Sequence, residues 1–132
     1  MLRCLLVDDN PQFLAAARSL LEREGLVVAG TASTTADALR QVAQLRPDVT
    51  LVDIDLGGES GFDLARQVAE GSSPTPVIMI STHAEDDYAD LIAASPAIGF
   101  VPKIALSARA VRTMLTGGDT DASATVSGPL GR

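Results

Sequence analysis

Two short apolar runs in this chain of 132 residues each end abruptly in acidic residues. Residues 4–7 are followed by Asp8 and Asp9, and residues 49–52 are followed by Asp53. A short apolar run bounded by turn signals is typical of a strand that is buried on both faces of a parallel sheet. The carboxyl ends of parallel strands share one edge, which is where such sheets bind ligands. We therefore expect these three carboxylates to meet at one edge of a sheet.

Apolar segments of strand length alternate with segments of helical periodicity along the chain. Strands are predicted over residues 3–7, 26–29, 49–52, 76–80 and 98–101, and helices over residues 11–24, 35–46, 61–69, 85–94 and 107–115. This alternation predicts an α/β fold, a flavodoxin-like, doubly wound (βα)5 sandwich around a five-stranded parallel sheet. The strand order 2-1-3-4-5 places the first and third strands side by side, with a switch point between their carboxyl ends.

The folded domain is expected to cover residues 1–116. Residues 117–132 are mostly Gly, Ser, Thr, Asp and Ala, and this composition predicts a flexible polar C-terminal tail.

The composition restricts the partners and the compartment. A net charge of −7 argues against binding of nucleic acid or of an anionic membrane surface, because both need a basic face. No stretch approaches the roughly 18 apolar residues of a membrane span. The single cysteine, Cys4, excludes an internal disulfide and is expected in the core. These features predict a cytoplasmic protein.

Three neighbouring carboxylates oppose one another's ionisation unless a cation lies among them. A set of oxygen ligands with room for water suits Mg²⁺. A zinc site is disfavoured, because the edge has no cysteine and the chain has a single histidine. The alternative is that Asp8 and Asp9 merely begin a helix and that Asp53 begins a turn.

Further polar residues follow the last two predicted strands. Ser81 ends the fourth strand, and Lys103 follows the fifth. A hydroxyl donor and an ammonium beside a carboxylate and Mg²⁺ are the groups that a phosphoryl group needs, with the carboxylate as nucleophile. Taken singly, Ser81 is as typical of a helix cap and Lys103 of a solvated charge.

The chain resembles the receiver domains of two-component response regulators over about residues 3–116. The resemblance rests on Leu5-Leu6-Val7-Asp8-Asp9, Val52-Asp53-Ile54-Asp55-Leu56, Val77-Ile78-Met79-Ile80-Ser81 and Gly99-Phe100-Val101-Pro102-Lys103. It implies that Asp53 accepts a phosphoryl group from the phosphohistidine of a histidine kinase or phosphotransfer protein. It also implies a magnesium site made by the side chains of Asp9 and Asp53, the backbone carbonyl of Asp55, and a water held by Asp8. Lys103 would pair with the phosphoryl group and Ser81 would donate a hydrogen bond to it.

The resemblance also implies a switch. Ser81 would move toward the phosphoryl group, and Phe100 would turn inward and reshape a protein-interaction face made by the fourth helix, fifth strand and fifth helix. That face would serve a downstream effector or a phosphorylation-dependent homodimer. Asp55 and His83 would flank the path of attacking water and tune the loss of the phosphoryl group. Apart from this self-catalysed chemistry, the chain is expected not to be an enzyme.

Two positions depart from the common pattern of the family. Many receivers have proline at the positions of Gly57 and Ile104, and the second change is found in regulators that carry a helix-turn-helix output domain. The segment after the fifth predicted helix is too short for such a module. The chain is therefore expected to be a single-domain receiver or a receiver excised from a longer regulator.

Two other functions remain open. The chain could be a receiver-like interaction module that works without phosphorylation. Asp53-Ile54-Asp55 also resembles the Asp-x-Asp motif of haloacid-dehalogenase-type phosphatases, which use an aspartate nucleophile. That motif usually follows the first strand, and the phosphatase interpretation leaves Asp8 and Asp9 without a role.

Overall fold

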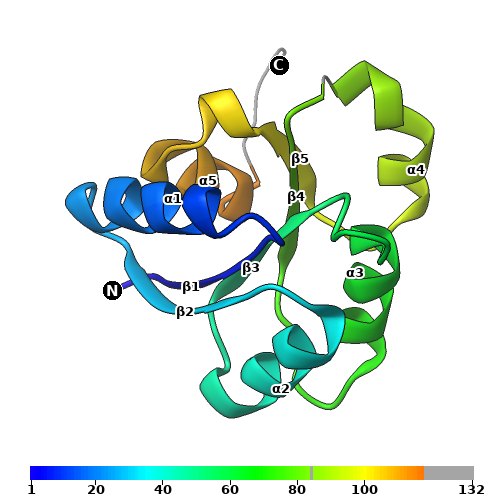
Figure 1. Ribbon diagram of the computed structural model, residues 1–132, viewed down its shortest axis with the longest axis horizontal. Helices are drawn as coiled ribbons and strands as arrows, with labels where there is room; N and C mark the ends of the chain where they lie inside the picture. Colours follow the sequence, from blue (N-terminus) through cyan, green and yellow to red (C-terminus); the bar gives the residue numbers. More distant parts are fainter. Residues whose placement is uncertain (84, 118–132) are drawn as a thin grey trace, which may run out of the picture.

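The computed structural model describes residues 1–83 and 85–117, and its centre is a parallel sheet with strand order β2-β1-β3-β4-β5 (Figure 1). The strands are β1 (Arg3–Val7), β2 (Val27–Ala32), β3 (Val49–Asp53), β4 (Val77–Ser81) and β5 (Gly99–Pro102). Each adjacent pair runs parallel. The predicted doubly wound fold and its strand order are confirmed.

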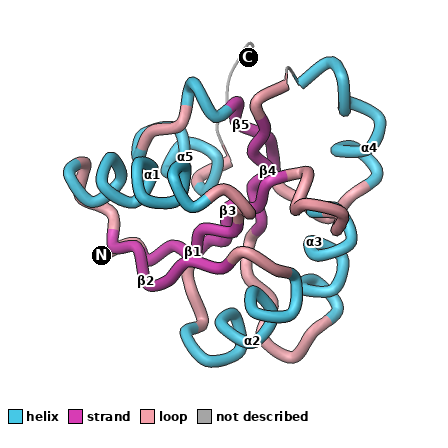
Figure 2. Tube along the Cα trace, in the orientation of Figure 1, coloured by secondary structure: helices cyan, strands magenta, loops and turns pink. Residues whose placement is uncertain are grey.

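Helices cover both faces of the sheet (Figure 2). They are α1 (Pro11–Arg23), α2 (Thr35–Leu45), α3 (Gly61–Glu70), α4 (Ala89–Ala94) and α5 (Ala108–Leu115), with 3-10 turns η1 (Glu85–Tyr88) and η2 (Lys103–Ala105). Helices α1 and α5 pack on one face, and α2, α3 and α4 pack on the other. This two-sided cover explains why the strands are mostly apolar along their length and do not alternate between apolar and polar residues.

Two predicted elements differ from the observed ones. Strand β2 runs on to Ala32 instead of ending at residue 29, because Gly30, Thr31 and Ala32 pair with the end of β1 although they are not strongly apolar. The helix predicted over residues 85–94 is divided into η1 and α4. Tyr88, the last residue of η1 and the N-cap of α4, has φ −130° and ψ 12°, and its ring packs against Phe62 and His83.

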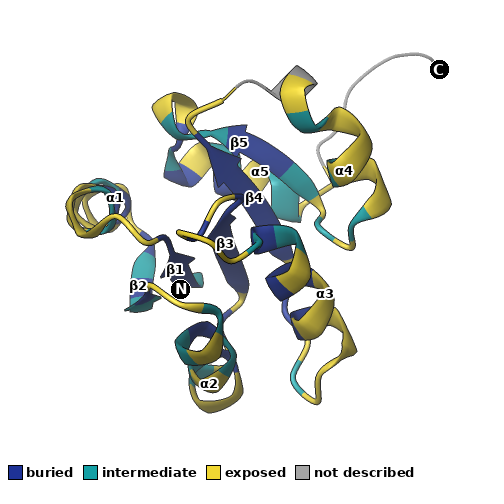
Figure 3. Ribbon diagram, turned by 45° about the vertical axis from the view of Figure 1, so that its right-hand side comes forward, coloured by how far each residue is buried: buried dark blue, intermediate teal, exposed yellow. Residues whose placement is uncertain are grey.

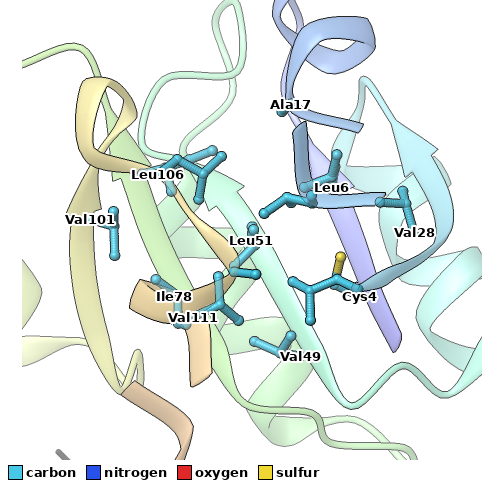
Figure 4. Close-up of a cluster of buried hydrophobic side chains, with 14 residues drawn as sticks. Cys4, Leu6, Ala17, Val28, Val49, Leu51, Ile78, Val101, Leu106 and Val111 are labelled. Atoms are coloured by element: carbon cyan, nitrogen blue, oxygen red, sulfur yellow. The ribbon is translucent and has the colours of Figure 1, made fainter. Parts of the chain in front are cut away.

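The core has two halves, one on each face of the sheet. Successive residues of a strand point to opposite faces, so that Cys4 and Leu6 face α1 and α5 whereas Leu5 and Val7 face α2 and α3. Figure 3 shows the central strands buried, and Figure 4 shows the half that includes Cys4. Burial, and to a smaller extent the charge of Glu22, raises the pKa of the Cys4 thiol to about 11. Cys4 is thus a core residue, as predicted.

Helix α1 begins where the first acidic pair ends. Asn10 Oδ1 accepts hydrogen bonds from the backbone N–H groups of Gln12 and Phe13, and Pro11 occupies the first helical position. Residue 11 is the predicted start of this helix, and the cap fixes the direction in which the chain leaves Asp8 and Asp9.

Within residues 1–83 and 85–117, no helix combines the length and apolarity needed to cross a membrane. Apart from Gly117, the predicted tail lies outside the described residues.

Candidate functional site

Three carboxylates converge at the carboxyl ends of β1 and β3. The two strands pair directly, with Val7 opposite Val52, so that the acids after them lie at one edge. Asp8, Asp9 and Asp53 each present a carboxylate oxygen, and these oxygens all lie within 4.8 Å of one another. Asp8 and Asp53 are buried, whereas Asp9 is exposed. The predicted meeting of the three acids is therefore observed.

Backbone N–H groups fix one oxygen of each buried carboxylate. The N–H of Asn10 donates to Asp8 Oδ1 at 2.9 Å, and the N–H of Asp55 donates to Asp53 Oδ1 at 3.2 Å. The second oxygen of each carboxylate, Oδ2, faces Lys103.

Lys103 begins η2 at the end of β5 and bridges the two buried acids. Its Nζ lies 2.6 Å from Asp8 Oδ2 and 3.1 Å from Asp53 Oδ2, and its side chain is 13% exposed. Burial by itself would lower the pKa of Lys103, but the hydrogen bonds to Asp8 and Asp53 outweigh it and leave the pKa above the ordinary value. Lys103 is therefore a protonated ammonium held beside Asp53.

Burial and the neighbouring groups shift the pKa of the Asp53 carboxyl in opposite directions. Burial raises its pKa, and the charge of Asp8 acts in the same direction. The N–H of Asp55 and the ammonium of Lys103 lower the pKa, but they do not cancel the effect of burial. Asp53 is thus a poorly solvated carboxylate, which is a more reactive nucleophile than one in bulk water.

The donor set fits a magnesium ion. Three carboxylates against one ammonium leave two negative charges uncompensated, which is the charge of one divalent cation. The carboxylate of Asp55 does not belong to this cluster; it is exposed and accepts a hydrogen bond from the N–H of Gly57 at 3.1 Å. This placement is compatible with the predicted role of Asp55 through its backbone carbonyl.

Ser81 lies buried at the same edge, at the end of β4. Asp53 pairs with Ile80, so that Ser81 is one residue further along. The Ser81 Oγ accepts a hydrogen bond from the N–H of His83 at 3.0 Å and lies 3.5 Å from His83 Nδ1. The hydroxyl oxygen is therefore an acceptor for the turn after β4.

Phe100 is already inside the protein. Its side chain is 4% exposed and belongs to the half of the core that Tyr88 and Ile92 border. The inward turn predicted on phosphorylation therefore requires a second, exposed conformation of Phe100 in addition to the buried one seen here.

Two contributions to the site were missed in the sequence. Gly57, noted only as a departure, has φ 64°, and a β-carbon on it would lie 2.7 Å from Asp9 Oδ2. Phe13, which is not among the predicted site residues, covers Lys103 Nζ with its ring, whose centroid lies 4.3 Å from Nζ. The glycine turn after Asp53 could have indicated the contact between Gly57 and Asp9. No feature of the sequence indicates the contact between Phe13 and Lys103.

The sequence model of the response regulator receiver domain matches residues 4–115. This chain is a member of that family. The receiver domain is 36% identical over 105 residues to a protein-glutamate methylesterase/protein-glutamine glutaminase of Symbiobacterium thermophilum (77% of this chain, 29% of that protein). It is 31% identical over 104 residues to response regulator UvrY of Escherichia coli (78% of this chain, 48% of that protein). It thus spans less than half the length of these two relatives.

Solved structures agree with this assignment. The signal receiver domain of NarL from Mycobacterium tuberculosis superposes with a TM-score of 0.79 at 30% identity, covering 88% of this receiver domain and 97% of that chain.

Proposed function

We propose that this receiver domain accepts a phosphoryl group on Asp53 from the phosphohistidine of a histidine kinase or phosphotransfer protein. The observation that carries the proposal is the position of Lys103 Nζ, 3.1 Å from Asp53 Oδ2, beside a cluster of three carboxylates suited to Mg²⁺. An acceptor carboxylate, a cation site and an ammonium beside the acceptor are the parts that phosphoryl transfer to an aspartate needs.

In the proposed step, a carboxylate oxygen of Asp53 attacks the phosphorus atom. The new O–P bond forms as the P–N bond to the donor histidine breaks, and the imidazole nitrogen keeps the electron pair of that bond. The N–H of Asp55 orients the Asp53 carboxylate, and Lys103, whose Nζ lies 3.1 Å from Asp53 Oδ2, would turn from that carboxylate to the phosphoryl oxygens. When bound by Asp8, Asp9 and Asp53, Mg²⁺ would offset the negative charge of the phosphoryl oxygens.

The proposed switch starts at Ser81. Movement of Ser81 toward the phosphoryl group would weaken its contacts with His83 and so release the turn that precedes Tyr88. Tyr88 borders the same part of the core as Phe100, so that a change in the turn would reach α4 and β5. Exposed Leu91 and Ile98 offer apolar surface on this side for a downstream effector or a second copy of the chain.

His83 and Asp55 are proposed to tune the lifetime of the phosphoryl group. Both side chains are exposed, and each lies two residues beyond a residue that would contact that group, namely Ser81 and Asp53. His83→Ala is expected to change the half-life of dephosphorylation more than the rate of phosphorylation. Equal half-lives in the two proteins would exclude this role.

The test is incubation with Mg²⁺ and acetyl phosphate, followed by intact-mass and peptide mapping. The proposal predicts one labile acyl phosphate per chain, located on Asp53 and absent from Asp53→Asn. Continuous hydrolysis of the donor without labelled protein would instead indicate an Asp-nucleophile phosphatase. Neither label nor turnover would indicate a module that works without phosphorylation, and either result would overturn the proposal.

A further inference from the structure

The ammonium of Lys103 is enclosed by groups from three different elements. It forms ion pairs with Asp8 and Asp53 at the ends of β1 and β3, and the ring of Phe13 on α1 lies over it, with the centroid 4.3 Å from Nζ. A cation within about 6 Å of an aromatic centroid is attracted by the ring quadrupole. The ring therefore occupies a side of the ammonium that the two carboxylates leave open.

The position of Phe13 is determined by the start of α1. Its backbone N–H donates to the Asn10 cap at 3.3 Å, and Pro11 fixes the first helical residue. Its ring is half-buried against the part of the core that α1 and α5 share. A ring anchored in this way is a fixed surface, whereas Lys103 has a long and flexible side chain.

A ring in this place has a chemical use that an aliphatic side chain lacks. An ammonium is strongly hydrated, and burial removes part of that hydration. The face of an aromatic ring replaces the lost water electrostatically but makes no directional hydrogen bond. Nζ can therefore slide from the carboxylates to a phosphoryl oxygen without leaving the ring.

We infer that Phe13 is a positioning residue for phosphoryl transfer, because its ring holds the Lys103 ammonium beside Asp53 as the phosphoryl group arrives. The inference rests on the proposed function. The competing interpretation is that Phe13 only fills space in the core, in which case an aliphatic residue would serve as well.

The main test compares Phe13→Leu with Phe13→Trp. Leucine keeps apolar bulk but removes the ring, and tryptophan keeps a ring. With saturating acetyl phosphate and Mg²⁺, Phe13→Leu is expected to slow labelling of Asp53 by roughly 3- to 30-fold, whereas Phe13→Trp restores most of the rate. Leu14→Ala is the matched control, because Leu14 packs against the same half of the core from the next position of α1. It is expected to lower stability and leave the labelling rate within about two-fold.

Combining the Phe13 substitution with Lys103→Met shows whether Phe13 acts through the Lys103 ammonium or through the stability of the fold. In Lys103→Met, which has no ammonium, Phe13→Leu should cause no further slowing. Equal slowing by the leucine and tryptophan variants, or an undiminished effect of Phe13→Leu in Lys103→Met, would overturn the inference.

A readout without phosphorylation keeps this test separate from that of the proposed function. Lys103 is the only lysine in the sequence, so that acylation by acetic anhydride reports on it alone, with the N-terminal amine as internal reference. Phe13→Leu should raise the acylation rate of Lys103 roughly 3- to 30-fold relative to the N-terminus, and Phe13→Trp should not. An unchanged acylation rate of Lys103 in Phe13→Leu would overturn the inference. Failure of the wild-type protein to phosphorylate Asp53 would overturn the proposed function only.

Discussion

The backbone carbonyl oxygen of Asp53 lies so close to the α-carbon of Gly61 that a β-carbon on Gly61 would overlap it. The N–H of Gly61 donates to the carbonyl oxygen of Ile54 at 2.8 Å, and Ser60 caps the helix that Gly61 begins. The first turn of α3 is thus docked directly on the end of β3 that carries the acceptor carboxylate.

Gly61→Ala is therefore expected to lower the free energy of unfolding by about 1–3 kcal/mol, as overpacking of a rigid contact does, and to slow labelling of Asp53. Urea denaturation and acetyl phosphate labelling measure the two effects. Gly71→Ala at the other end of α3 is the control, because its β-carbon would come no closer than 3.3 Å, to the carbonyl oxygen of Gln67. Equal losses of unfolding free energy in Gly61→Ala and Gly71→Ala would contradict the close contact at Gly61.

The sequence predicted the acidic edge well for a physical reason. A strand covered on both faces is mostly apolar, so its end is marked by the first acidic residue, here Asp8 and Asp53. Right-handed crossovers then left few possible strand orders, and the one chosen brought the acids, Ser81 and Lys103 to one edge.

Contacts between distant side chains could not be predicted in the same way. Phe13 and Lys103 come together because of how α1 packs beside η2, and hydrophobic periodicity contains no information on that packing. The ring contacts of Tyr88 with Phe62 and His83, beside the break between η1 and α4, likewise join residues that are distant in the sequence or unmarked by any periodicity. Strand β2 was predicted too short because the pairing of Gly30 with Leu5 does not depend on hydrophobicity.

Magnesium is expected to stabilise the fold. A ligand that binds the native state alone at 100 times its dissociation constant adds about 2.7 kcal/mol to the free energy of unfolding. The melting temperature should therefore rise with Mg²⁺, and the rise should be lost in Asp9→Asn, which removes the exposed acid of the cluster. Asp90→Asn, which replaces an exposed acid on α4, should leave the rise in melting temperature with Mg²⁺ unchanged. A magnesium response that survives in Asp9→Asn would place the ion elsewhere.

Gly57 should matter more for magnesium binding than its neighbour Gly58. Both have positive φ, 64° and 99°, so that alanine strains the backbone at either position. A β-carbon at Gly57 would meet Asp9 Oδ2 at 2.7 Å, whereas one at Gly58 has nothing within 4 Å. Gly57→Ala is expected to weaken Mg²⁺ binding by roughly ten-fold, about 1.4 kcal/mol, beyond the effect of Gly58→Ala. Calorimetric titration measures the difference, and equal affinities would exclude a role for the contact.

Ionisation of Asp53 is expected to cost stability at neutral pH when no metal is present. Burial raises the pKa of Asp53 in the folded state, so the native protein takes up this proton at a higher pH than the unfolded chain does. The contribution of Asp53 to stability therefore improves as the pH falls through its raised pKa, and it levels off below the ordinary pKa of an aspartate. Lys103 stays protonated throughout this range, so its own raised pKa does not alter the sign.

Asp53→Asn, which cannot ionise, should thus be more stable than the wild type at pH 7 in EDTA. Lys103 keeps Asp8 as its partner in this variant. The advantage should shrink as the pH is lowered, and urea midpoints at a series of pH values measure it. An advantage that is constant or grows toward acid pH would show that burial does not raise the pKa of Asp53.

Two buried threonines should respond in opposite ways to replacement by valine. Thr50 Oγ1 in β3 has no hydrogen-bond partner among the described residues, whereas Thr75 Oγ1 donates to the carbonyl oxygen of Pro47 at 3.0 Å. A buried hydroxyl without a partner carries a desolvation penalty that a methyl group avoids, while loss of a buried hydrogen bond leaves the carbonyl unpaired. Thr50→Val is therefore expected to raise the free energy of unfolding by about 1 kcal/mol, and Thr75→Val to lower it by about 1 kcal/mol. Urea denaturation of both variants decides the matter, because destabilisation by Thr50→Val would mean that this hydroxyl is hydrogen-bonded after all.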